Sequence, residues 1–383
     1  MNNRQSVSEQ SGAKQSDTQR NNANKNRYLD SDARLFVRRL LESKIADLKD
    51  VKKVCRLIVV DDDGFSLGRI AKGLVDSGVL TRWQRDMLLR GKKRGFFLGD
   101  YQLRRPIGRG AMSVVYQAEH RTIKRPVALK ILPPDEADEA ILVDRFKREA
   151  NIAAQMDHTN VARVFAFEEI GNKYFMVMEY VDGLNLFEVV RRDGPLSVHQ
   201  TLSLTLQIAT GLAHIHERGL IHRDVKPTNL LRRDDGVMKI IDMGLAKMGW
   251  PEMQGLDPSR LVGTAEYVSP EQIVDCRQAD ARSDLYSLGC TMYFLLTGKA
   301  PFVSSKVPKL LAMHQSDAVP DVRATKPDCP DAVADLLKRL LAKRKDDRPR
   351  TANELVRQLR LVSESTRDES KIEIAPPSDT LFD

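Results

Sequence analysis

The stretch HRDVKPTN runs from His222 to Asn229 and lies between two short apolar segments. It places cations, an aspartate and an amide within one short loop. A loop that only meets water needs no such mixture, whereas a site that handles phosphate groups does. In this loop Asp224 can accept a proton from a hydroxyl, Lys226 can neutralise a phosphoryl oxygen, and Asn229 can coordinate a metal through its amide oxygen.

A second polar stretch, KIIDMGLA at Lys239–Ala246, follows downstream. Asp242 ends a short apolar run there, and Gly244 allows a sharp turn directly after it. Mg²⁺ prefers one or two carboxylates together with phosphate oxygens, and Asp242 with Asn229 meets that need. Each of these residues taken singly is also compatible with a simple cap or turn.

Lys130 is a charge inside the apolar run VALKIL, Val127–Leu132. An unpaired buried ammonium is costly, so a lysine in a buried strand requires an anion. Glu149 lies among small apolar residues of the next predicted helix and can supply that anion. The alternatives are an edge-strand lysine that faces water and a glutamate on a solvated helix face.

Two glycines, Gly108 and Gly110, lie in the stretch IGRGAMSVV between two predicted strands. Because they lack a Cβ, they let the backbone approach phosphate oxygens. Two glycines in a hairpin can equally form an ordinary turn. A dinucleotide-binding fold is not favoured, because a strand follows the glycines where that fold needs a helix.

These motifs occur in one order, which is glycine loop, strand lysine, helix glutamate, HRDVKPTN, DMG and then SPE at Ser269–Glu271. This order resembles the eukaryotic-like protein kinase family over residues 101–361. The resemblance implies an α+β, bilobal fold with a small antiparallel sheet lobe (about 101–180) that carries one helix, and a large, mainly helical lobe (about 181–361). Lys226 and the stretch VGTAEYVSPE are similar to serine/threonine kinases, and RFKREANIAAQMDH resembles the bacterial branch.

The resemblance implies roles for the matching positions. Gly108 and Gly110 cover the ATP phosphates, and Lys130 contacts the same phosphates and pairs with Glu149. Asp224 and Lys226 act on the substrate hydroxyl and the γ-phosphate, and Asn229 and Asp242 bind Mg²⁺ or Mn²⁺. The other implied ATP contacts are Ile107, Val115, Ala128, the gatekeeper Met178, Glu179 and Val181. The implied structural residues are Asp284, which braces the HRD loop, and the ion pair of Glu271 with Arg348.

Regulation is expected in the segment between DMG and SPE. Arg223 resembles the arginine that receives an activation-loop phosphate, and Ser259 is the expected acceptor. Thr264 is expected to have a structural role facing the substrate, with phosphorylation as the alternative. Three positions depart from the family pattern, and none removes a catalytic group: Ser113 replaces a third glycine, Met243 a phenylalanine and Ser269 an alanine.

The function implied by the resemblance is ATP-dependent phosphorylation of serine and threonine in protein substrates, as part of bacterial signal transduction and under control of activation-loop autophosphorylation. A different class of function, a pseudokinase scaffold that binds ATP without efficient transfer, is the alternative. A scaffold does not need Lys130, Glu149, Asp224, Asn229 and Asp242 together, so their joint presence favours the enzyme.

Composition sets outer limits on the whole chain. Its 383 residues exceed the roughly 250–300 at which single cores stop growing, so more than one domain is expected. The net charge of +8 is spread along the sequence without a nucleic-acid-binding signature, so no nucleic acid partner is expected. Four widely separated cysteines indicate free thiols in a reducing compartment. Because no apolar run approaches the ~20 residues of a membrane span and no signal-peptide pattern occurs, we expect a cytoplasmic protein.

The N-terminal quarter is the least readable part. Residues 1–28 are polar and basic and are expected to be disordered, as are residues 362–383. Residues 29–100 are expected to form a helical module and linker, because apolar residues recur at helical spacing, as at Leu67, Ile70 and Leu74. This module can dock on the small lobe, recruit a substrate or other protein partner, dimerise, or act as a spacer, and the composition does not choose among these.

Overall fold

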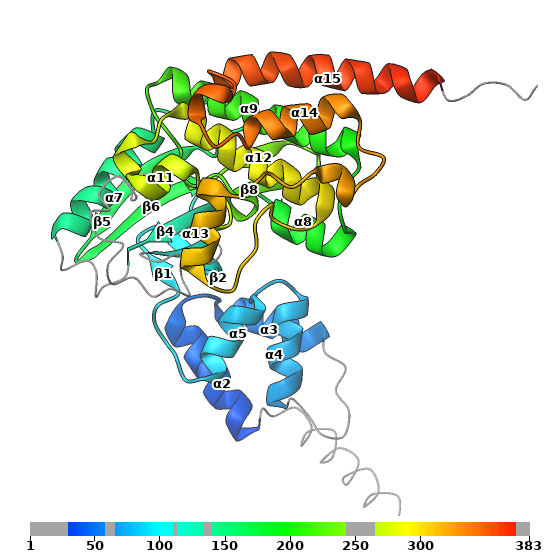
Figure 1. The fold of residues 1–383 in the computed structure, drawn as a ribbon. Helices are drawn as coiled ribbons and strands as arrows, with labels where there is room; N and C mark the ends of the chain where they lie inside the picture. Colours follow the sequence, from blue (N-terminus) through cyan, green and yellow to red (C-terminus); the bar gives the residue numbers. More distant parts are fainter. Residues whose placement is uncertain (1–29, 58–65, 110–112, 133–139, 243–264, 373–383) are drawn as a thin grey trace, which may run out of the picture. The chain divides into compact units, whose positions relative to one another are not determined.

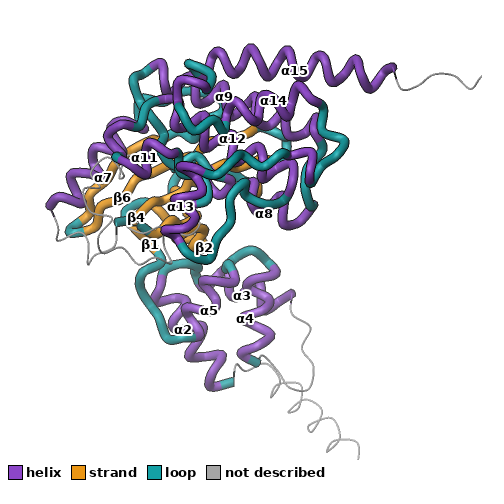
Figure 2. Tube along the Cα trace, viewed as in Figure 1, coloured by secondary structure: helices purple, strands orange, loops and turns teal. Residues whose placement is uncertain are grey.

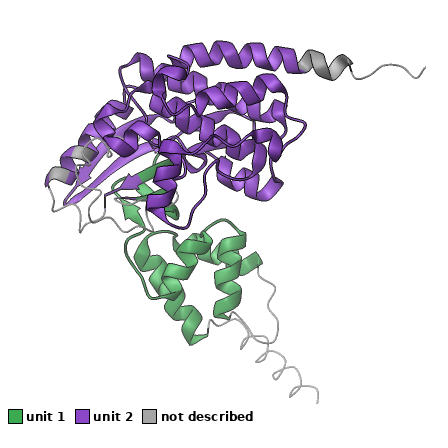
Figure 3. Ribbon diagram, viewed as in Figure 1, with its two compact units in different colours: residues 1–110, 114–129 green, residues 111–113, 130–383 purple. Residues whose placement is uncertain are grey.

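The computed structural model describes residues 30–57, 66–109, 113–132, 140–242 and 265–372. The chain divides into two compact units (Figure 3). Unit 1 contains residues 1–110 and 114–129, and unit 2 contains residues 111–113 and 130–383. The expected disordered segment 1–28 lies outside the described residues.

The N-terminal part of unit 1 is a helical module, which we define as helices α2 to α5. They are α2 (Ser31–Ser43), α3 (Leu48–Leu57), α4 (Leu67–Asp76) and α5 (Arg82–Leu89). Phe36 and Leu40, one helical turn apart on α2, are buried in one cluster with Ile70 and Leu74 of α4. Cys55 lies in α3.

Unit 1 continues into antiparallel strands. They are β1 (Phe97–Leu98), β2 (Tyr101–Arg109), β3 (Val114–His120) and the first part of β4 (Pro126–Ile131), and neighbours follow in that order. The hairpin of β2 and β3 pairs Tyr101 with His120 at its base and Arg109 with Val114 at its tip. Two register shifts interrupt it, one between Leu103 and Arg105 and one between Pro106 and Gly108.

Unit 2 begins within β4, followed by α7 (Ala140–Ala153) and the hairpin of β5 (Val164–Ile170) and β6 (Lys173–Glu179). A small sheet of β7 (Gly183–Asn185), β8 (Leu230–Arg233) and β9 (Met238–Ile240) follows. The strand pair β8 and β9 lies between the two polar motifs of the sequence, because HRDVKPTN ends where β8 begins and Asp242 comes just after β9.

Helices make up the rest of unit 2 (Figure 2). They are α8 (Leu186–Asp193), α9 (Val198–Glu217), α11 (Pro270–Val274), α12 (Ala281–Thr297), α13 (Val307–Ser316), α14 (Asp331–Leu340) and α15 (Ala352–Ile372). Single-turn 3₁₀ helices occur at Pro227–Asn229, Cys276–Gln278, Val322–Ala324 and Lys345–Asp347. The central helix α12 packs against α9, α14 and α15 (Figure 1) and is buried over almost its whole length.

A close contact fixes β9 against α9. A Cβ added at Gly211 of α9 would lie 2.8 Å from Ile240 Cδ1 and 3.2 Å from the carbonyl oxygen of Asn160. A larger residue at this position would require the Ile240 side chain and the Asn160 segment to shift, so glycine allows the close approach. The contact holds β9, and with it the start of the Asp242 motif, on the helical core of unit 2.

The sheet strands followed by a helical region confirm the predicted α+β class, and the helical module before the strands is also confirmed. Helix α15 extends to Ile372, which corrects the expected start of a disordered tail at residue 362. The stretch 362–372 is polar but contains Glu364, Arg367, Glu369 and Lys371, whose residue types favour helix. No helix of the described ranges has both the length and the apolar character needed to cross a bilayer.

The stability of unit 2 is expected to depend on His314 of α13. This side chain is fully buried, with its Nδ1 2.9 Å from the Tyr286 hydroxyl oxygen and its ring 5.0 Å from that of Phe302. Burial and the charge of Lys343 lower the pKa of His314 to about 4. In the unfolded chain the pKa of His314 is about 6.5. Between about pH 6.5 and pH 4 this side chain therefore binds more protons in the unfolded state than in the folded state.

We therefore expect the free energy of unfolding to fall by about 2 kcal/mol between pH 7 and pH 5 through this one group. The variant His314→Gln keeps an acceptor for Tyr286, but glutamine does not titrate. Between pH 7 and pH 5 its free energy of unfolding is therefore expected to fall by about 2 kcal/mol less than that of the parent protein. Urea unfolding at both pH values measures the difference. Equal losses in the two proteins would contradict the assignment to His314.

Candidate functional site

The backbone of the HRD motif is held by one buried carboxylate. Asp284, on the first turn of α12, accepts hydrogen bonds of 2.8 Å from the backbone N–H groups of His222 and Arg223. It also lies 2.8 Å from His216 Nε2 at the end of α9. Burial alone would raise the pKa of Asp284, but the hydrogen bond from His216 and the nearby charge of His222 outweigh it, so the pKa lies below its usual value.

Arg223 takes a positive φ of 65°, which is unfavourable for a residue with a Cβ. Contacts on both sides fix this conformation. Its N–H bonds to Asp284, and its carbonyl accepts a hydrogen bond of 3.2 Å from Gln272 Nε2 on α11. Gln272 was missed in the sequence analysis, because no local signal marks a glutamine that supports a distant carbonyl.

Three predicted residues of the loop lie together. Lys226 Nζ is 3.0 Å from Asp224 Oδ2. Asn229 Nδ2 donates to both the backbone oxygen and Oδ2 of Asp224, each at 2.9 Å. The 3₁₀ turn at Pro227–Asn229 produces this arrangement, because it turns Asn229 back toward the residue five positions earlier. The arrangement orients the Asp224 carboxylate with one cation and one amide.

Lys130, Glu149 and Asp242 form a second group. Lys130 Nζ lies 2.6 Å from Glu149 Oε1 and 3.2 Å from Asp242 Oδ1. Burial acts to lower the pKa of Lys130, but the two carboxylates outweigh it and raise that pKa above its usual value. The lysine is therefore a permanent cation. Its pairing with Glu149 matches the prediction, whereas its contact with Asp242 was not predicted.

The two groups are joined through backbone hydrogen bonds. The N–H of Ile241 donates to the carbonyl of Asn229 at 3.0 Å, and His222 Nε2 lies 3.1 Å from the carbonyl of Ile241. Asp242, the next residue, takes a positive φ of 51°. Aspartate tolerates this conformation better than most residues. The carboxylates of Asp224 and Asp242 therefore come from adjacent, mutually bonded loops.

The donor set of these loops fits a hard divalent cation. Asn229 directs its amide nitrogen at Asp224, so its amide oxygen faces elsewhere, and Asp242 offers a carboxylate that is 34% exposed. Mg²⁺ is typically bound by one or two protein oxygens, with phosphate and water completing its shell. Within the described part of the chain no three His, Cys, Asp or Glu side chains gather as an all-protein metal cage. Asn229 and Asp242 offer the one or two protein oxygens that a phosphate-bound Mg²⁺ takes.

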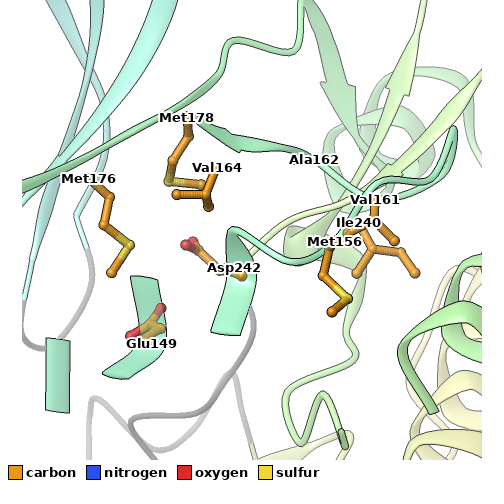
Figure 4. A pocket seen from close by; sticks show the side chains of 10 residues that line it. Glu149, Met156, Val161, Ala162, Val164, Met176, Met178, Ile240 and Asp242 are labelled. Carbon is orange, nitrogen blue, oxygen red and sulfur yellow. The ribbon is translucent and has the colours of Figure 1, made fainter. Parts of the chain in front are cut away.

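An apolar pocket adjoins the second group (Figure 4). Met176 and Met178 of β6 and Val164 of β5 line it, together with the carboxylate residues Glu149 and Asp242. The predicted gatekeeper Met178 is therefore a lining residue of this pocket. Val181, two residues beyond β6, is buried.

Glu179, the last residue of β6, is fixed by its neighbours. Its backbone N–H donates to the carbonyl of Arg163 at 2.8 Å, so this N–H is not free to bond a ligand. Its partly exposed carboxylate forms an ion pair of 2.9 Å with the buried Lys239 of β9. This ion pair was not predicted from the sequence. It ties the end of β6 to the strand that precedes Asp242.

Glu271 and Arg348 form a buried ion pair in unit 2, as the sequence resemblance implied. Arg348 Nη1 lies 2.8 Å and Nη2 3.0 Å from the two oxygens of Glu271. Burial acts to raise the pKa of Glu271, but the hydrogen bonds and charge of Arg348 outweigh it and hold the pKa below its usual value. Ser283 at the start of α12 also donates to Glu271, at 2.6 Å.

The predicted glycine-loop residues belong to unit 1. Ile107 and Gly108 lie at the end of β2, Val115 in β3, and the buried Ala128 in β4. A Cβ added at Gly108 would first meet Val115 at 3.8 Å, an ordinary contact, and its φ is not in the left-handed region. Packing within unit 1 therefore does not require a glycine at this position. Gly110, Ser259 and Thr264 lie outside the described residues.

We expect the variant Gly108→Ala to weaken nucleotide binding with little change in the stability of the protein. Alanine is favoured over glycine within a strand, so the free energy of unfolding is expected to change by less than about 1 kcal/mol. The added methyl group obstructs a phosphate that approaches the backbone, so the dissociation constant for ATP is expected to rise about tenfold. Gly68→Ala, a glycine of α4 with open space around it, is the matched control. Unchanged ATP affinity in Gly108→Ala would contradict the role of this glycine.

Comparison with known proteins gives a family match. Residues 101–359 match the family model of the protein kinase domain. The serine/threonine-protein kinase PrkC of Bacillus subtilis is 33% identical over 269 residues, which cover 70% of this chain and 41% of that protein. Serine/threonine-protein kinase PknB of Mycolicibacterium smegmatis is 36% identical over 261 residues, which cover 67% of this chain and 41% of that protein. The chain thus spans less than half the length of these curated relatives.

A solved structure is similar over the same part of the chain. The crystal structure of the Mycobacterium tuberculosis PknI kinase domain aligns with a TM-score of 0.54 and 27% sequence identity. The alignment covers 70% of this chain and 98% of that domain.

Proposed function

Because the chain belongs to the protein kinase domain family, we propose that it transfers the γ-phosphoryl group of ATP to serine and threonine hydroxyls of protein substrates. The observation that carries the proposal is the joint arrangement of Asp224 with Lys226 and Asn229, and of Lys130 with Glu149 and Asp242. Phosphoryl transfer requires little covalent chemistry from the protein. It requires alignment and compensation of charge, which these two groups provide.

Asp224 is the proposed base and orienting group for the substrate hydroxyl. The hydroxyl oxygen attacks the γ-phosphorus, the bond from that phosphorus to the bridging oxygen of ADP breaks, and the hydroxyl proton passes to the Asp224 carboxylate. Lys226, 3.0 Å from Asp224, is placed to balance negative charge on the transferred group. Its position two residues after the aspartate favours serine and threonine as acceptors.

Lys130 is the proposed contact for the α- and β-phosphates. The paired carboxylates keep it charged, and Glu149 fixes its position on the α7 side. Gly108 and Gly110 are proposed to bring backbone N–H groups to the phosphates. The proposed contacts of the adenosine part are Ile107, Val115, Ala128, Met178, Glu179 and Val181.

Asn229 and Asp242 are the proposed ligands of the divalent metal, and we propose Mg²⁺, with Mn²⁺ as a substitute. When bound, the metal neutralises charge on the phosphate oxygens. The protein must keep Asn229 and Asp242 close to each other. The hydrogen bond from the N–H of Ile241, next to Asp242, to the carbonyl of Asn229 does this. Lys130 beside Asp242 limits the repulsion between that carboxylate and the phosphates.

Control by phosphorylation is also proposed. Arg223 lies beside Asp224, so a phosphate bound by its guanidinium would act on the site through the backbone that Asp284 and Gln272 fix. Ser259 is the proposed acceptor and Thr264 the second candidate. We also propose that the chain acts on protein substrates in signal transduction and is located in the cytoplasm. The limits of the catalytic domain at residues 101 and 361 are predictions from the sequence.

The test is incubation of the full chain with Mg-ATP and a generic basic protein, followed by mass spectrometry of both proteins. We expect phosphate on serine and threonine side chains and none on tyrosine. The scaffold alternative predicts a higher unfolding temperature with ATP but no incorporated phosphate. Phosphate on tyrosine alone would contradict the proposed acceptor class, and no phosphate at all would contradict the transfer.

A further inference from the structure

Strand β2 carries an irregularity on its way to the glycine loop. Leu103 pairs with Ala118 of β3, but the next pair is Arg105 with Gln117, so Arg104 has no counterpart in the register of β3. A β-bulge of this kind leaves the extra residue unpaired and bends its strand. The backbone groups around Arg104 therefore need partners other than β3.

The first turn of α5 supplies those partners. The hydroxyl of Thr81 donates to the carbonyl of Arg104 at 2.5 Å, and Nε2 of Gln84 donates to the carbonyl of Leu103 at 2.8 Å. Gln84 is completely buried. Its amide is therefore a fixed structural donor rather than a chance surface contact. All four residues belong to unit 1.

The same two side chains also cap α5. Thr81 Oγ1 accepts from the N–H of Gln84 at 3.2 Å, and Gln84 Oε1 accepts from the N–H of Thr81 at 2.9 Å. A capping box needs only acceptors at these two positions. Aspartate and glutamate would cap the helix, but neither can donate to β2 when ionised. Threonine and glutamine satisfy both requirements, because each carries a donor and an acceptor.

The other strand of the hairpin is contacted by Trp83. Its ring packs edge-on against Tyr116 of β3 at 5.8 Å, and against Phe96, just before β1, at 5.9 Å. Helix α5 therefore touches both strands that lead to and from the glycine loop. The bonded carbonyl of Arg104 precedes Gly108 by four residues, which is about 13 Å of extended strand.

We propose that Thr81 and Gln84 are positioning residues for nucleotide binding: by fixing the bulge of β2 they set where the glycine end of the β2–β3 hairpin lies. The helical module then supports the β2–β3 hairpin during nucleotide binding and is more than a spacer. The family model matches residues 101–359 and does not include Thr81 or Gln84. The inference rests on the proposed use of ATP, but its contacts are independent of transfer.

The test uses substitutions that keep the helix cap and remove the donor. These are Thr81→Asp and Gln84→Glu, and Thr81→Ser is the conservative variant that keeps both functions. Arg39→Met is the matched control, because Arg39 bonds to the carbonyls of Leu88 and Leu89 inside the module and does not contact β2. It loosens the module while leaving the α5–β2 bonds in place.

Backbone exchange, nucleotide binding and kinetics are measured on each full-length variant. The first is hydrogen exchange of the peptide covering residues 101–109 without nucleotide. The second is the dissociation constant of a fluorescent ATP analogue, with kcat and the KM for a basic protein substrate measured beside it. Thr81→Asp is expected to speed exchange and to weaken nucleotide binding about fivefold, while kcat and the KM for protein stay within about twofold. Thr81→Ser is expected to match the parent protein.

The outcomes separate the inference from the proposed function. Faster exchange with unchanged nucleotide affinity in both Thr81→Asp and Gln84→Glu would overturn the inference, and so would an equal loss of affinity in Arg39→Met. Failure of the parent protein to transfer phosphate would contradict the proposed function instead. The exchange and binding measurements would still decide the role of Thr81 and Gln84.

Discussion

Asp224→Asn is expected to lower kcat by at least the ~10²–10⁴-fold typical of losing a positioned base. Asparagine keeps the volume of the side chain and an oxygen toward Lys226, so the fold and the affinity for ATP are expected to be unchanged. What is lost is the carboxylate that accepts the proton. Steady-state kinetics at saturating Mg-ATP measure the effect.

The control for this prediction is Asp235→Asn, which neutralises an exposed aspartate in the turn between β8 and β9. Its kcat is expected to match that of the parent protein. A purified Asp224→Asn protein with full activity would contradict the assignment of Asp224, whatever the behaviour of the control.

Arg348→Met is expected to lower the free energy of unfolding by about 3–5 kcal/mol, because it leaves the Glu271 carboxylate buried without its cation. Arg348 is completely buried, whereas the Glu271 side chain is 9% exposed. The guanidinium also donates to the backbone carbonyls of Ala342, Arg282 and Lys343. Urea unfolding of the two proteins measures the difference.

Arg323→Met is the matched control. Arg323 also pairs with two aspartates, Asp321 and Asp331, but these groups are exposed to solvent. Exposed pairs contribute about 0–1 kcal/mol, so the control is expected to change stability by no more than that. If Arg348→Met and Arg323→Met lowered the free energy of unfolding by similar amounts, the buried ion pair would contribute no more to stability than the exposed one.

The family and its catalytic loop could be predicted from the sequence because the motifs are local. HRDVKPTN fixes the spacing of Asp224 and Asn229, and a 3₁₀ turn is enough to bring them together. The resemblance to protein kinases is confirmed by the family match, and the α+β class is confirmed by the strands and helices. The pairing of Lys130 with Glu149 was also predictable, since a buried cation needs an anion.

The supporting contacts could not be predicted, because they join residues far apart in the chain. Gln272 bonds the carbonyl of Arg223, and Lys239 pairs with Glu179 across 60 positions. A glutamine or lysine gives no local sign of which distant group it meets. The capping box of Thr81 and Gln84 was not predicted, although it is a local pattern at the start of α5, and its second role depends on a bulge in β2 that no sequence pattern marked.

The proposed function is transfer of the γ-phosphoryl group of ATP to a protein hydroxyl, with Asp224 as the base. The most direct measurement compares γ-labelled and α-labelled Mg-ATP, with the parent chain and Asp224→Asn as enzymes and a basic protein as acceptor. We predict label in protein only from the γ-labelled nucleotide, and its loss in Asp224→Asn. No label from γ-labelled ATP would contradict phosphoryl transfer by this chain, and equal labelling by the two proteins would contradict the role of Asp224.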